Sequence, residues 1–116
     1  MNFNLTNKTA LVCGGSQGLG LATAKELALL GATVILASRT EAKLATALQQ
    51  LDGTNGQQHQ YLVIDLSMPE EAQSIVANWI LKNGAIHILI NNAGGPPAGP
   101  MINTAAAELV GRPIGA

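Results

Sequence analysis

The chain has 116 residues, of which 47% are hydrophobic, 11% charged and 3% aromatic, and its formal net charge is −1. This length favours a single domain, and the apolar composition is the opposite of that of a disordered chain. A near-neutral charge with so few stacking aromatics argues against a nucleic-acid-binding protein. The lone cysteine, Cys13, excludes an intramolecular disulfide and a thiolate metal cluster, so we expect no metal.

The N-terminal residues 1–8 lack the apolar stretch of a signal peptide. No apolar run reaches the roughly 18–20 residues that a membrane span requires. We therefore expect a protein that crosses no membrane, and the lone cysteine fits a reducing, cytoplasmic setting best.

The first half of the chain alternates between short apolar runs and helical stripes. Residues 9–13 (TALVC) predict a buried strand that ends at Gly14-Gly15. A helical stripe follows, with Gly31 as its stop, made of Leu19, Thr23, Leu27 and Leu30. Residues 33–37 (TVILA) then predict a second buried strand.

The second half continues this alternation. A stripe of Leu44, Leu48 and Leu51 precedes a third predicted strand over residues 61–64. The third helix has the fullest helical spacing, through Ala72, Ile75, Val76, Trp79 and Ile80. Ser67 and Glu70 predict a capping box at its start, with Pro69 in the first turn and Gly84 at its end. Residues 86–90 (IHILI) predict a fourth strand.

This order predicts an α/β protein with a Rossmann-like, three-layer α/β/α fold and a parallel sheet of about four strands in the order 3-2-1-4. We expect a dinucleotide-binding domain over residues 1–103 and an atypical, poorly ordered tail over residues 104–116. The order leaves strand 86–90 as an uncovered apolar edge, through which the chain could associate with itself.

Gly14, Gly18 and Gly20 lie between the first predicted strand and the first helix. The free N–H groups and the dipole at a helix N-terminus form an anion site, and glycines let the backbone approach a pyrophosphate closely. The alternative is an ordinary glycine-rich turn, and Thr23 replaces the third glycine of G-x-G-x-x-G. The position at the first strand-to-helix junction nevertheless favours dinucleotide binding.

The end of the second strand favours NADP over NAD. NAD-binding units place an acidic residue there for the ribose 2′-hydroxyl, whereas this chain has Ser38-Arg39-Thr40. A guanidinium would pair with the 2′-phosphate of NADP, although a solvated surface arginine is the alternative. Gln17 carries no charge, so the preference would depend mainly on Arg39.

Two further strand ends carry polar residues. Asp65 could accept from an adenine amino group or cap its local turn. Asn91 and Asn92 could line the cofactor crevice or form a plain turn. Structural roles are expected for His59, His87, Trp79 and Cys13.

Three motifs in order resemble the classical short-chain dehydrogenase/reductase family. Residues 13–20 (CGGSQGLG) match T-G-x-x-x-G-x-G with Cys13 in place of Thr, Asp65-Leu66 matches the adenine-contacting pair, and residues 91–94 match N-N-A-G. The resemblance covers roughly residues 5–103, and residues 94–100 are similar to 3-oxoacyl-carrier-protein reductases. It implies these cofactor contacts: Gly14, Ser16, Gln17, Gly18, Leu19, Gly20, Ser38, Arg39, Thr40, Asp65, Leu66, Asn91, Ala93 and Gly94.

The resemblance implies hydride transfer between a nicotinamide and a carbonyl or alcohol. The family's catalytic Ser and Tyr-x-x-x-Lys lie beyond N-N-A-G, and Tyr61, the only tyrosine, lies in the third predicted strand. We therefore expect no catalytic residue in this chain, which would be a truncation, a frameshift or a fragment of a longer parent that binds the substrate. A non-catalytic NADP(H)-binding module and an inactive remnant are the alternatives.

Overall fold

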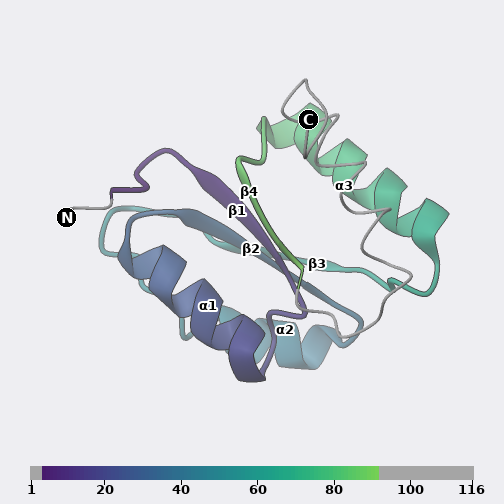
Figure 1. Ribbon diagram of the computed structural model, residues 1–116, viewed down its shortest axis with the longest axis horizontal. Helices are drawn as coiled ribbons and strands as arrows, with labels where there is room; N and C mark the ends of the chain where they lie inside the picture. Colours follow the sequence, from purple (N-terminus) through teal and green to yellow (C-terminus); the bar gives the residue numbers. More distant parts are fainter. Residues whose placement is uncertain (1–3, 92–116) are drawn as a thin grey trace.

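The computed structural model describes residues 4–91, in which strands and helices alternate (Figure 1). The elements are β1 (Thr9–Cys13), α1 (Gly18–Leu29), β2 (Thr33–Ser38), α2 (Glu41–Leu48), β3 (Gln60–Val63), α3 (Pro69–Asn83) and β4 (Ile88–Asn91). Helices α1 and α2 cover one face of the sheet and α3 covers the other (Figure 1). The expected three-layer arrangement is thus confirmed.

The four strands form one parallel sheet in the order β3-β2-β1-β4, as the sequence predicted. Leu11 in β1 is in register with Ile35 in β2 and with Leu89 in β4. Strands β1 and β2 therefore form the centre of the sheet, and their apolar residues are buried on both faces because helices cover both sides.

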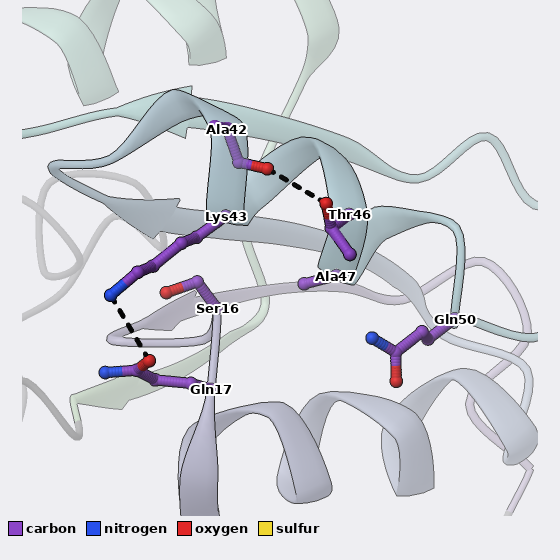
Figure 2. Close-up of a pocket in the computed structure, with 7 residues that line it drawn as sticks. All are labelled: Ser16, Gln17, Ala42, Lys43, Thr46, Ala47 and Gln50. Atoms are coloured by element: carbon purple, nitrogen blue, oxygen red, sulfur yellow. Dashed lines mark hydrogen bonds between the residues drawn. The ribbon is translucent and has the colours of Figure 1, made fainter.

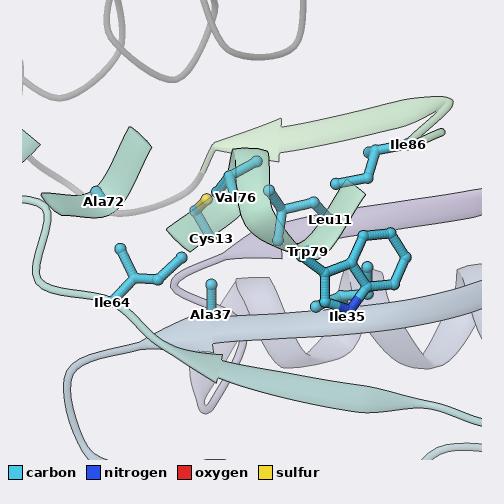
Figure 3. Close-up of a cluster of buried hydrophobic side chains, with 9 residues drawn as sticks. All are labelled: Leu11, Cys13, Ile35, Ala37, Ile64, Ala72, Val76, Trp79 and Ile86. Carbon is cyan, nitrogen blue, oxygen red and sulfur yellow. The ribbon is translucent and has the colours of Figure 1, made fainter. Parts of the chain in front are cut away.

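Alternate residues of these central strands point to opposite faces and form two cores. On the α3 face, Leu11 and Cys13 pack with Trp79, which is 8% exposed, within a cluster that Figure 3 draws. On the opposite face, Val12 and Leu36 pack with Leu44 of α2. Cys13 and Trp79 thus have the core roles that the sequence indicated.

A histidine stands directly before each edge strand. His59 precedes β3, and its Nδ1 accepts from the Val34 N–H at the start of β2, 2.9 Å away. His87 precedes β4, and its Nδ1 accepts from the Thr9 N–H at the start of β1, 3.0 Å away. We call these two contacts the histidine clips, and they give both histidines the structural role that was expected.

Strands β2 and β3 differ from their predicted bounds by one residue, and two further local predictions also differ from the structure. The capping box at α3 is wrong: Met68 is the N-cap residue and no side chain caps the helix. The Asp65 carboxylate instead accepts from the N–H and the hydroxyl of Ser67, at 2.9 and 2.6 Å, so Ser67 is held in the preceding turn. Strand β4 begins at Ile88 rather than residue 86. Before it, the His87 N–H donates to Thr9 O, but the Thr9 N–H donates to the His87 ring and not to a backbone carbonyl, so regular strand pairing starts one residue later.

Candidate cofactor site

The parallel order brings the carboxyl ends of all four strands to one edge of the sheet. Cys13, the last residue of β1, is in register with Ala37 of β2 and with Asn91 of β4. Ser38, at the end of β2, is in register with Val63 of β3. The glycine turn (residues 14–20), Arg39, Asp65 and Asn91 therefore gather along this carboxyl edge, where open α/β sheets bind ligands.

The glycine turn depends on glycine at two kinds of position. Gly14 and Gly18 have φ angles of 78° and 59°, which favour glycine. At Gly20, a Cβ would lie 2.1 Å from the Gly14 carbonyl oxygen, so α1 begins directly against the turn. Gly15, which was not among the expected cofactor contacts, is also confined, since its Cβ would lie 2.9 Å from Leu36 Cδ2.

The N-terminus of α1 suits an anion better than the other two helix starts. Gln17 is its N-cap residue without a side-chain hydrogen bond, and its first turn contains no acidic residue. Glu41 stands in the first turn of α2, and Glu70 and Glu71 stand in that of α3. The positive end of the α1 dipole is therefore not offset by a carboxylate of its own first turn.

The end of β2 places Arg39 and Thr40 on the surface, with Ser38 half-buried. The Ser38 hydroxyl accepts from the Thr40 N–H at 3.4 Å, which fixes the turn into α2. Arg39 is thus exposed at the carboxyl edge, directly after the strand whose Ala37 carbonyl accepts from the Gly14 N–H of the glycine turn at 2.8 Å.

Asp65 was expected either to contact the adenine or to cap its local turn, and the structure shows the hydrogen bonds of the second role. The Ser67 hydroxyl and then the Ser67 N–H hold the pKa of the Asp65 carboxyl below its usual range, and the charge of Arg39 adds to this effect against a small desolvation cost. Asp65 is therefore a carboxylate that caps its local turn, with Arg39 close enough to contribute charge. Leu66 beside it is half-buried and packs against the α3 core.

The remaining predicted residues are placed as follows. Leu19 is 72% exposed in the first turn of α1. Asn91 is exposed at the end of β4, opposite Cys13. Ala93 and Gly94, like Asn92 and the expected tail, lie outside the described residues.

A cavity of about 320 Å³ opens between the glycine turn and α2 (Figure 2). Its lining residues are Ser16, Gln17, Ala42, Lys43, Thr46, Ala47 and Gln50. Ser16 and Gln17 were expected at the site, whereas the α2 residues were missed. Their only signal in the sequence is that α2 begins two residues after Arg39, and which of its side chains reach the glycine turn depends on how the helix packs.

Other chemistries find little support in the part of the chain that the structure describes. Residues 4–91 contain no group of three or more His, Cys, Asp or Glu side chains that could hold a metal ion. Burial raises the pKa of the Cys13 thiol to about 12, so Cys13 is not a thiolate nucleophile at neutral pH. None of the described helices has the length and hydropathy needed to cross a membrane.

Comparisons with known proteins agree with this geometry. The profile of the short chain dehydrogenase family matches residues 8–112, which includes part of the segment expected to be a tail. An uncharacterized oxidoreductase from Mycobacterium tuberculosis is 32% identical over 107 residues, covering 92% of this chain and 40% of that protein. The 3-oxoacyl-[acyl-carrier-protein] reductase of Chlamydia muridarum is 34% identical over 94 residues, covering 81% of this chain and 38% of the reductase.

Solved structures show the same relationship. A short chain dehydrogenase from Salmonella enterica serovar Typhi has a TM-score of 0.81 at 27% identity, covering 94% of this chain and 55% of that chain. L-Sorbose reductase from Gluconobacter frateurii, complexed with NADPH and L-sorbose, has a TM-score of 0.75 at 25% identity, covering 94% and 48% of the two chains. The chain spans between 27% and 40% of the length of these and similar curated relatives. It belongs to the short chain dehydrogenase family of oxidoreductases, which bind nicotinamide dinucleotides.

Proposed function

We propose that this chain is the NADP(H)-binding part of a short chain dehydrogenase that transfers hydride between nicotinamide and a carbonyl or alcohol. One observation carries the proposal: an acid-free helix start lies against a turn in which a Cβ at Gly20 would meet the Gly14 oxygen at 2.1 Å. Such a turn lets a pyrophosphate approach the backbone N–H groups of a helix start. The residues present therefore fit a dinucleotide.

Each part of the cofactor has residues suited to it along the carboxyl edge. The turn from Gly14 to Gly20, with Ser16, Gln17, Gly18 and Leu19, would hold the pyrophosphate and the adenosine ribose. Arg39, flanked by Ser38 and Thr40, would bind the 2′-phosphate through its forked donors. Asp65 and Leu66 would border the adenine, and Asn91, Ala93 and Gly94 the nicotinamide half. The bound cofactor supplies the hydride chemistry, and the chain's residues orient it.

The charge of Arg39 gives the test of cofactor preference. We expect NADPH to bind the 116-residue chain more tightly than NADH, and Arg39→Asp to reverse this order, because a carboxylate repels the 2′-phosphate and accepts from a 2′-hydroxyl. Nicotinamide fluorescence and thermal stability would be followed in one titration. Lys82→Asp, on the exposed end of α3, is the charge-matched control. An unchanged preference in Arg39→Asp would contradict the assignment of NADP.

We further propose that this chain alone does not turn over substrate, because it contains no Tyr-x-x-x-Lys pair. The substrate would then be a small carbonyl or alcohol bound by a longer protein, and a 3-oxoacyl thioester is one class that the Chlamydia relative suggests. A non-catalytic NADP(H)-binding module is the second candidate, favoured by a complete glycine turn without the proton donor. Dehydrogenase activity of the purified chain would contradict the proposed absence of turnover and also the non-catalytic module. A cytoplasmic location and a domain ending near residue 103 belong to the same proposal.

A further inference from the structure

Lys43 lies across the cavity from the glycine turn. It stands in the first turn of α2 and is exposed, and its Nζ donates to Gln17 Oε1 over 3.5 Å (Figure 2). This distance is at the outer limit of a hydrogen bond, and the acceptor is a neutral amide. Within residues 4–91 no ion pair is made by the Lys43 ammonium. Its full positive charge is therefore directed at the glycine turn without a compensating carboxylate.

The cavity that Lys43 borders is polar where it meets this turn. Figure 2 draws the Lys43 ammonium, the Ser16 hydroxyl and the Gln17 amide at one end of the cavity and Gln50 at the other. The hydroxyl of Thr46 donates to Ala42 O at 3.1 Å and is thus committed to its own helix. None of the lining residues is acidic. This end of the cavity therefore combines a cation with neutral donors, which suits a phosphate group.

The nearest acidic residue on α2 is held elsewhere. Glu41 accepts from the Tyr61 hydroxyl at 3.2 Å, a contact that directs its carboxylate to β3, and it does not line the cavity. Arg39 stands two positions before Glu41, at the end of β2. Two cations, Arg39 and Lys43, thus flank the β2–α2 turn beside the adenosine end of the proposed cofactor site.

We propose that Lys43 is a second cation for the 2′-phosphate of NADP(H) and a specificity-determining residue of this chain. On binding, its ammonium leaves the weak contact with Gln17 and pairs with the 2′-phosphate, while Ser16 and Gln17 donate to the same oxygens. NAD(H) has only a hydroxyl at this position, so Lys43 adds affinity for NADP(H) alone. The inference rests on the proposed function and extends its phosphate site from β2 to α2.

The test compares NADP⁺ with NAD⁺, which differ only in the 2′-phosphate. The dissociation constants of both would be measured by calorimetry for the 116-residue chain, Lys43→Gln, Lys43→Arg and the control Lys82→Gln. We expect Lys43→Gln to weaken NADP⁺ binding about fivefold, the effect that one exposed ion pair supports. NAD⁺ binding should be unchanged, Lys43→Arg should retain most of the NADP⁺ affinity, and Lys82→Gln should change neither.

Each other outcome has a definite meaning. A wild-type chain that prefers NADP⁺, with the same preference in Lys43→Gln, contradicts the inference and leaves the proposed function standing. Equal weakening of both dinucleotides would place Lys43 at the pyrophosphate or in the fold and would also overturn it. A wild-type chain that binds neither dinucleotide contradicts the proposed function itself, and the role of Lys43 falls with it. Thermal unfolding without ligand separates a binding defect from a folding defect, because an exposed lysine should leave it unchanged.

Discussion

Among the described glycines, Gly20 leaves the least room for a side chain, since an added Cβ would lie 2.1 Å from the Gly14 carbonyl oxygen. We expect Gly20→Ala to lower the free energy of unfolding by about 3 kcal/mol, because the new methyl forces α1 away from the turn, and to abolish dinucleotide binding. Urea unfolding and a binding titration would measure the two effects. Gly53→Ala is the control, since its Cβ would meet Gln57 O at an ordinary 3.7 Å. Equal stability of the two variants would contradict the close approach.

Burial of Cys13 gives stability a pH dependence. The pKa of its thiol rises from 9.0 to about 12 in the folded chain, so between these pH values the unfolded chain loses a proton that the folded chain keeps. Stability from this residue is therefore present below pH 9 and lost as pH rises, at a limit of about 1.4 kcal/mol per pH unit. Urea unfolding across this range should show a shallower pH slope for Cys13→Ala than for the wild type. Identical slopes would mean that the thiol is accessible to solvent.

At the scale of elements, the histidine clips fasten each edge strand to its inner neighbour. The ring of His59 accepts from Val34 N–H and lies 2.7 Å from Asp52 O through Nε2, so it also holds the loop before β3. His59→Ala would leave the part-buried Val34 N–H without its partner, and we expect a loss of about 1–3 kcal/mol in the free energy of unfolding. Gln58→Ala, at an exposed neighbour, is the control. Urea unfolding and hydrogen exchange at Val34 would reveal the loss, and full protection of that amide in His59→Ala would contradict the clip.

The elements were largely predictable because each strand is a continuous apolar run and each helix carries a periodic stripe. The strand order 3-2-1-4 is that of a Rossmann-like unit with right-handed crossovers. Which hydrogen bonds Ser67 makes was not predictable. In the sequence it looks like a helix cap, but both its N–H and its hydroxyl donate to the Asp65 carboxylate. The position of Lys43 over the glycine turn was also hidden, because it depends on how α2 packs on β2 rather than on any motif.

For the whole molecule, the outer sides of β3 and β4, the two edge strands of the sheet, are the places where another strand could pair. Within residues 4–91 no strand pairs with the outer side of β4, so the predicted self-association stays a proposal. We expect the weight-average mass in sedimentation experiments to rise with concentration for the wild-type chain and to stay constant for Ile88→Lys, because a charge on an edge strand opposes pairing. Ile88 is half-buried and belongs to neither core cluster, so this change should spare the fold.

The control for this experiment lies at the opposite edge. Val63 ends β3 and is 43% exposed, and Val63→Lys should leave the concentration dependence of the mass unchanged. A constant monomer mass for the wild-type chain, or an equal effect of the two lysines, would exclude association through β4.

The histidine clips lie at the amino ends of the strands, whereas the glycine turn, Arg39 and Asp65 lie at the carboxyl ends. The contacts that hold the edge strands and the side chains that would determine ligand specificity thus lie at opposite ends of the sheet. A library that randomises Arg39, Thr40 and Lys43 should therefore yield mostly folded members with altered cofactor preference. In evolutionary terms, substitutions at the carboxyl ends of the strands can change the bound nucleotide while the contacts at the amino ends keep the fold.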